Sequence, residues 1–165
     1  MVISELVRIF APEMNRNLFI ISGCNGAGKT TASYTVLPEI LDCKEFVNAD
    51  EIARGLSPFN LVRRAKEKGY IVRLLFFWLN SPELALLRIA ERVAKGGHNI
   101  PELIVRRRYI AGINNLFRLF MNEVDYWVIY DNSEYPAVLI AKGGKNDSVN
   151  IMIESTYKTI ADYVK

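Results

Sequence analysis

The sequence predicts a single α/β domain built on a mainly parallel sheet, and three observations carry that prediction. Short apolar segments typical of buried strands alternate along the chain with segments of helical character. Two apolar segments, Tyr70 to Leu79 and Tyr126 to Tyr130, are almost uninterrupted, as in strands that helices cover on both faces. A glycine-rich stretch joins another apolar segment to a helical one. Parallel pairing is favoured because a crossover helix is the usual connection between parallel strands.

The first half of the chain is predicted as strand, helix, strand and helix. An apolar run from Asn17 to Ser22 predicts a buried strand, and Lys29 to about Leu41 the helix after it. Glu45 to Ala49 predicts a second, short strand that ends at Asp50. Leu61 to Gly69 is charged and helical, with glycine as the stop signal.

In the second half, Tyr70 to Leu79 is the strand just described, and Ser81-Pro82-Glu83 is a strong helix start. The hydroxyl caps the first N–H groups, proline suits the first turn, and the acid suits the positive end of the helix dipole. The remaining expected elements are this helix as far as Gly96-Gly97, a second helix from Pro101 to about Phe120, strands at Tyr126–Tyr130 and Pro136–Ala141, and a mixed strand–helix ending from Asn150 to Lys165.

Composition limits the class of protein. Half of the 165 residues are apolar, which is enough for one domain with a core, and we expect a single domain over residues 1–165. No apolar run approaches the roughly eighteen residues of a membrane helix, and the amphipathic N-terminus is unlike a signal peptide. Cys24 and Cys43 are too few for a disulfide framework, which favours a reducing cytoplasm. A net charge of +3 permits anionic ligands, and we expect neither nucleic acid nor membrane as a partner.

The stretch GCNGAGKT, from Gly23 to Thr30, matches the phosphate-loop pattern G-x-x-x-x-G-K-[ST], known as Walker A. Glycines let backbone N–H groups approach an anion, and the next helix adds a partial positive charge. Lys29 would reach the β- and γ-phosphates, and the Thr30 hydroxyl would hold Mg²⁺. A glycine-rich turn without a ligand is the alternative, which the flanking strand and helix disfavour. The expected nucleotide-binding residues are Asn25, Gly26, Ala27, Gly28, Lys29, Thr30 and Thr31.

Two side chains near this loop each allow two interpretations. Cys24 is either a redox-sensitive thiol or an inert filler, and we favour the filler. Asp50 follows the second strand at the sheet edge where ligands bind. It could accept a proton from a substrate hydroxyl that attacks the γ-phosphate, or cap the helix that follows, and both can hold. Glu51 is a weaker candidate for the same role.

Arginines gather on the two helices after the third strand. Arg88 and Arg92 are four residues apart and share a helix face, and Arg106-Arg107-Arg108 follow on the next helix. They could form a basic lid over the phosphates, or simply solvated helix faces. Three consecutive helical residues point in three directions, so not all of 106–108 can face one ligand. His98 is expected to make hydrogen bonds in the loop between the helices.

In combination, GCNGAGKTT, FVNADEIARGLSP, RRAKEKGY, SPELALLRIAERVAKGGHNIPE, RRRY and YDNS resemble the zeta-toxin-like P-loop kinases, from about Asn17 to about Ser133. The resemblance implies a nucleoside-kinase-like fold with helices on both faces of the sheet and a small helical lid that carries arginines. It implies ATP (or GTP) with Mg²⁺, and transfer of the γ-phosphate to a hydroxyl of a small molecule. In the best-known members the acceptor is the UDP-amino sugar UDP-N-acetylglucosamine. The family also suggests an antitoxin protein as a partner.

The resemblance further implies roles for individual residues. Lys29 and Thr30 match the phosphate lysine and the hydroxyl that binds the metal. Asp50 matches the general base, and Arg92 and Arg107 match arginines that contact the transferring phosphate. The implied catalytic residues are therefore Asp50, Lys29, Arg92 and Arg107.

One departure from the family lies between Asn60 and Leu61, where relatives carry a few dozen further residues that shape the acceptor site and supply a core strand. Either the segment is deleted here, or only ordered residues are printed and a mobile segment is omitted. We favour omission, which would separate the two Cα atoms by far more than the ~3.8 Å of a peptide link. A small-molecule kinase is the first hypothesis for function, and a catalytically silent nucleotide-binding regulatory module is the alternative. Nucleic-acid binding has only the arginine cluster to support it.

Overall fold

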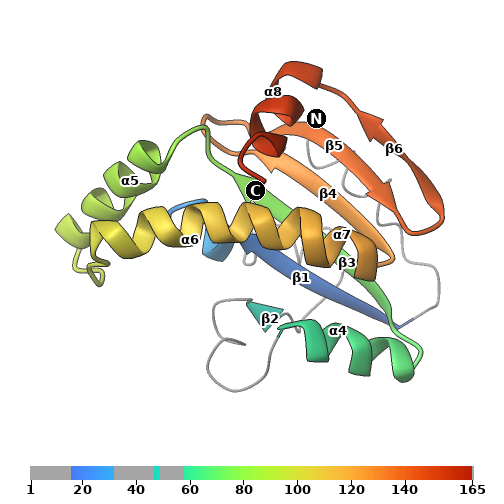
Figure 1. Cartoon of the computed structure of the whole chain (residues 1–165). Coiled ribbons are helices and arrows are strands. Elements are labelled where there is room, and N and C mark those ends of the chain that lie inside the picture. The colour runs from blue at the N-terminus through green and yellow to red at the C-terminus, as the bar shows by residue number, and fades with distance from the viewer. Residues whose placement is uncertain (1–15, 32–46, 49–57, 165) are drawn as a thin grey trace.

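The computed structural model describes residues 16–31, 47–48 and 58–164, which form a mixed α/β fold with helices packed on an open six-stranded sheet (Figure 1). The strands lie in the order β2-β1-β3-β4-β5-β6. Their bounds are Asn17–Gly23 for β1, Val47–Asn48 for β2, Ile71–Trp78 for β3, Tyr126–Asp131 for β4, Val138–Gly144 for β5 and Asp147–Ile151 for β6. All strands that the sequence predicts are present where the structure describes the chain.

The prediction of a mainly parallel sheet holds for four strands and is wrong for two. β2, β1, β3 and β4 are parallel, whereas β5 and β6 are antiparallel to their neighbours. The connections explain the difference. No helix lies between β4 and β6 in the chain, and a turn at residues 145–146 connects β5 to β6. Connections this short cannot carry a strand back to the starting edge, so the chain reverses its direction instead.

The helices follow the predicted order. They are α4 at Pro58–Glu67, α5 at Pro82–Ala94, α6 at Glu102–Asn115, the π-helical turn η1 at Leu116–Phe120, α7 at Met121–Glu123 and α8 at Glu154–Ala161. α6, η1 and α7 continue one another, so the predicted helix from Pro101 to about Phe120 is confirmed with a π turn near its end. None of the helices in the described ranges is long and apolar enough to cross a membrane.

The core lies on both faces of β3, the central strand. Every residue from Val72 to Leu79 is buried, because β1 and β4 flank the strand and helices cover it. α6 and α8 cover one face together (Figure 1), where the Tyr109 ring on α6 meets the Tyr163 ring beyond α8 with centroids 5.5 Å apart. The Tyr109 hydroxyl donates to the Leu79 carbonyl over 2.6 Å and ties α6 to the end of β3. The predicted helix from Lys29 to Leu41 is described only as far as Thr31, so helices on both faces stay a prediction.

The chain is continuous between Asn60 and Leu61. α4 runs through both residues as one continuous helix, and the omission of a segment here stays a prediction. The helix is anchored at its far end, where the Lys66 ammonium lies 2.9 Å from the Asp125 carboxylate and donates to the Glu123 carbonyl over 2.7 Å. β1 has β2 and β3 as its direct neighbours, with no further strand between. Among the described residues, the additional strand that the resemblance implies is not part of this sheet.

Candidate phosphate-binding site

The glycine-rich loop leaves the carboxyl end of β1 and enters a helix at Lys29. Gly23, Gly26 and Gly28 have φ values of 146°, 78° and 79°, which side chains disfavour. A Cβ atom at Gly23 would lie 2.2 Å from the Phe77 carbonyl oxygen on β3, so β1 and β3 could not keep their distance with any larger residue there. The glycines of the motif are therefore required by the backbone path and by its contact with the neighbouring strand.

Lys29 is buried with only 8% of its surface exposed, and its ammonium lies against the loop. It donates to the Gly23 and Cys24 carbonyls, each over 3.0 Å. A buried ammonium must be compensated, and here carbonyl oxygens of the loop supply part of the compensation. The arrangement places one positive charge among backbone groups at the carboxyl edge of the parallel strands, where α/β proteins bind ligands.

Cys24 lies inside the same loop and is buried. Loss of solvation raises the pKa of its thiol to about 11, although the nearby Lys29 charge acts in the opposite direction. At neutral pH the thiol is therefore protonated and a poor nucleophile. The interpretation as an inert filler is supported, and the redox interpretation is not.

Asn25 contributes an oxygen without a partner. Its Oδ1 atom is buried in the loop and accepts no hydrogen bond within the described structure. A buried acceptor of this kind costs free energy unless a ligand or a water molecule satisfies it. Thr30 and Thr31 are exposed at the first helical turn, on the side of the loop open to solvent.

Two side chains from distant elements hold the loop. Arg88 on α5 donates to the Gly26 carbonyl over 3.4 Å and to the Ser133 carbonyl over 2.9 Å. Asn132, directly after β4, donates to the Ala27 carbonyl over 2.9 Å. From the sequence, Arg88 is only one of several candidate lid arginines, and Asn132 has no predicted role. The signal for Asn132 was a polar triplet at the carboxyl end of a buried strand, next to the phosphate loop in a parallel sheet.

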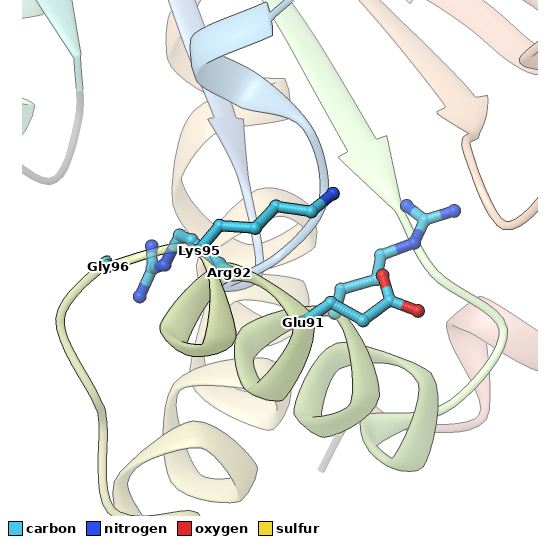
Figure 2. A pocket seen from close by; sticks show the side chains of 6 residues that line it. Glu91, Arg92, Lys95 and Gly96 are labelled. Atoms are coloured by element: carbon cyan, nitrogen blue, oxygen red, sulfur yellow. The ribbon is translucent and has the colours of Figure 1, made fainter.

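α5 and the turn after it form a hollow of about 460 Å³ (Figure 2). Its lining is Arg88, Glu91, Arg92, Lys95, Gly96 and Gly97, three cations against one acid. Arg92 turns toward the end of the helix, where it donates to the His98 carbonyl over 2.8 Å. The hollow connects with the loop through Arg88, which contacts both.

The arginines on α6 are divided. Arg106 binds Glu102 on its own helix at 2.8 Å and Glu83 at 2.6 Å, and the second pair ties α6 to the start of α5. These contacts raise the pKa of Arg106 and lower that of Glu83. Arg107 is exposed and makes no ion pair with any described residue. The structure therefore brings Arg92 into the hollow beside Arg88 but does not bring Arg107 to the loop.

Asp50 and Glu51 lie outside the described residues, so the general base that the sequence suggests stays a prediction. In the described ranges no three His, Cys, Asp or Glu residues form a cluster that could hold a metal ion. Among the described residues of the loop, the Thr30 hydroxyl is one group that could contact a divalent cation held by ligand phosphates.

Comparison with known proteins places the fold. The chain has a TM-score of 0.66 and 15% identity with a crystal structure of the AvrRxo1-ORF1:AvrRxo1-ORF2 complex with sulphate ions, covering 96% of this chain and 66% of that one. The same complex with ATP gives a TM-score of 0.66 at 16% identity, with the same coverage. The PezAT chromosomal toxin-antitoxin system of Streptococcus pneumoniae gives 0.54 at 14% identity, covering 99% of this chain and 93% of that one. At such identities the likeness establishes the fold alone.

At the level of sequence, no family model matches the chain. An uncharacterized protein of Haemophilus influenzae is 44% identical over 55 residues, which are 33% of this chain and 39% of that protein. The matched part thus spans well under half of this relative, and the chain spans about two thirds of the AvrRxo1 chain. The class that these findings define is a mixed α/β fold like that of the AvrRxo1 and PezAT structures.

Proposed function

We propose that this chain is a small-molecule kinase of the zeta-toxin-like kind, in which the loop from Gly23 to Thr30 binds the phosphates of ATP or GTP. The observation that carries the proposal is the loop itself. Three glycines with positive φ surround a buried Lys29, between a parallel strand and the start of a helix. This combination of a glycine-rich backbone, a helix start and an ammonium is suited to a polyphosphate.

Two further observations support a nucleotide as the ligand. Asn25 Oδ1 is a buried acceptor without a partner in the described structure, as expected where a ligand completes the hydrogen bonding. The AvrRxo1 complex, which has the same fold, has been crystallised with ATP. ATP and GTP both fit this proposal, because the loop would contact the phosphates and not the base.

In the proposed reaction, a hydroxyl oxygen of the acceptor attacks the γ-phosphorus while the bond to the β,γ-bridging oxygen breaks and the nucleoside diphosphate leaves. Asp50 would take the proton of the attacking hydroxyl. Lys29 would leave its loop carbonyls for the β- and γ-phosphates, and Thr30 would bind Mg²⁺, which neutralises phosphate charge when present. Arg92 and Arg107 would stabilise the transferring group.

The acceptor and partner follow from the resemblance. We propose a UDP-amino sugar, such as UDP-N-acetylglucosamine, as the acceptor, because its hydroxyls suit this transfer. We propose an antitoxin protein as partner, an idea that the PezAT toxin-antitoxin system supports because it shares the fold. The match covers 66% of the AvrRxo1 chain, so that chain has further residues without a counterpart here.

One observation favours a second candidate, a catalytically silent nucleotide-binding regulatory module. α4 is continuous at Asn60–Leu61, where the resemblance implies a segment that shapes the acceptor site. Without that segment, nucleotide binding could persist while transfer is lost. The two candidates therefore differ in the product and not in nucleotide affinity.

A product screen separates them. Purified protein is incubated with Mg²⁺ and ATP or GTP, with a panel of nucleotide sugars, and mass spectrometry detects the gain of a phosphoryl group. We expect a product from wild type, none from Lys29→Ala, and transfer reduced by about 10²–10⁴-fold in Asp50→Asn, whose nucleotide affinity should persist. Nucleotide binding without product from any acceptor would instead establish the silent module. Wild-type transfer by Asp50→Asn would exclude Asp50 as the base.

A further inference from the structure

Two consecutive carbonyl groups of the phosphate loop are held by side chains that belong to other elements. The Gly26 carbonyl accepts from Arg88 on α5 over 3.4 Å, and the Ala27 carbonyl accepts from Asn132 after β4 over 2.9 Å. Both donors are far away in the sequence, by 62 and 105 residues. The contacts therefore form only when the loop, α5 and the end of β4 are assembled.

Because a C=O group and the N–H of the next residue share one peptide plane, a contact that fixes the carbonyl also fixes the direction of that N–H. In a trans peptide, the C=O of one residue and the N–H of the next point in opposite directions. The Ala27 N–H donates to the Cys24 carbonyl over 3.2 Å, so the plane between Gly26 and Ala27 is held on both sides. Among the described residues, Asn132 is the group that holds the next plane, and its contact turns the Gly28 N–H away from Asn132.

The need for such control is greatest at Gly28. The φ of Gly28 is 79°, and glycine can move from this region of φ to others at little cost in energy. Without support, the peptide plane at Gly28 could therefore rotate. Asn132 lies so close that a Cβ on Gly28 would be 2.7 Å from its Nδ2 atom. An amide that donates from this position stabilises one orientation of the plane.

Arg88 adds a second connection. Its other terminal nitrogen donates to the Ser133 carbonyl over 2.9 Å, so one guanidinium group joins the loop to the residue after Asn132. Ser133 is itself fixed, because its hydroxyl accepts from the Asn80 N–H over 2.8 Å and donates to the Asp131 carboxylate. A lysine could not reproduce this planar fork.

We propose that Asn132 and Arg88 are positioning residues that set the peptide planes of the phosphate loop, so that its amides are oriented for a polyphosphate before the ligand arrives. They act through the loop and need not touch the nucleotide. This inference rests on the proposed function, since it presumes that the loop binds phosphates.

The test uses Asn132→Asp, which removes the donor and retains the shape, and Arg88→Lys, which retains the charge and removes the fork. Because Asn132→Asp also adds a negative charge that repels phosphate, hydrogen exchange without ligand is its deciding measurement. The matched controls are Asn150→Asp and Arg118→Lys, at exposed positions on β6 and η1. Calorimetry measures the Kd of Mg·ATP and of inorganic tripolyphosphate, which has no base or ribose. Melting temperature and hydrogen exchange of the 23–30 peptide are measured without ligand.

Both test variants should raise the Kd of both ligands by about tenfold or more, as expected when a carbonyl loses its donor. Both should also speed hydrogen exchange in the loop peptide. Controls should bind as wild type does. Wild-type affinity in either folded variant overturns the role of that residue, and the Arg88→Lys result stands alone if Asn132→Asp does not fold. An equal loss of affinity in the control variants would also contradict the inference. Failure of wild type to bind either ligand would instead overturn the proposed function.

Discussion

Cys24 illustrates how the environment of a single residue decides its chemistry. The thiol lies within a loop proposed to bind phosphate, yet it is buried and its pKa is raised to about 11. Below that pKa the thiolate fraction falls tenfold for each pH unit, so at pH 8 about one thiol in a thousand is ionised. The position requires a small apolar side chain rather than a nucleophile.

We therefore predict that Cys24 reacts slowly with iodoacetamide in the folded protein. In a Cys43→Ser variant, which leaves Cys24 as the sole thiol, alkylation at pH 8 should be at least about a hundredfold slower than in denaturant. The rate in the folded protein should rise as the pH is increased from 8 to 10, since the thiolate population grows. Mass spectrometry over time measures both rates, and equal rates in folded and denatured protein would contradict the burial of the thiol.

The arginines show what a sequence pattern leaves open at this scale. Helical spacing placed Arg88 and Arg92 on one face, and the structure confirms that both line the same hollow. It also separates their roles, because Arg88 binds the loop while Arg92 binds the His98 carbonyl. Arg106 pairs with Glu102 one turn earlier on α6, as its spacing allows. Its pair with Glu83 could not be predicted, because the approach of α6 to α5 depends on tertiary packing.

At the scale of elements, helix α5 begins where local chemistry predicts. Ser81 has extended backbone angles, and its hydroxyl accepts from the Leu84 N–H over 3.2 Å, with proline next in the chain. The other end closes at Gly96, whose φ is 87°. Such boundaries are predictable because the first and last backbone groups of a helix need partners within a few residues.

We predict that Ser81→Ala destabilises the fold by about 1 kcal/mol, the usual value of a side-chain cap. Ser81→Asp should retain most of the stability, because a carboxylate accepts the same hydrogen bond and favours the positive helix end. Urea unfolding followed by circular dichroism gives the free energies of unfolding. Equal stability of Ser81→Ala and wild type would show that the cap contributes nothing.

β5 and β6 mark the limit of prediction at this scale. A strand at Pro136–Ala141 and a mixed ending were expected, and the structure has β5 at Val138–Gly144 followed by β6 and α8. Every residue of β6 is exposed, so apolar alternation could not reveal it. Its pairing with β5 depends on the turn between them and on backbone hydrogen bonds.

At the scale of the whole molecule, stability is concentrated in the central strand. Leu74 on β3 is fully buried and lies in register with Ile20 on β1 and Trp127 on β4. We predict that Leu74→Ala lowers the free energy of unfolding by about 2–5 kcal/mol, through lost burial and a residual cavity. That is a large share of the roughly 5–15 kcal/mol by which a domain is stable.

Leu103→Ala is the matched control, since this leucine is 78% exposed on α6. Its effect should stay within about 0.5 kcal/mol. Denaturant unfolding of both variants measures the difference. A similar loss in the two leucine variants would indicate that β3 is not the centre of the core.

The sequence by itself determined the phosphate loop, the helix boundaries around α5 and the apolar strands that form the sheet. These features depend on neighbours within a few residues, such as a cap, a glycine with positive φ or a continuous apolar run. Only the tertiary structure decided that β5 and β6 run antiparallel, and that Arg88 and Asn132 hold the loop. The antiparallel pairing depends on connections too short for a crossover helix. The hold on the loop depends on contacts between residues 45 to 105 positions apart, whose energies no local pattern contains.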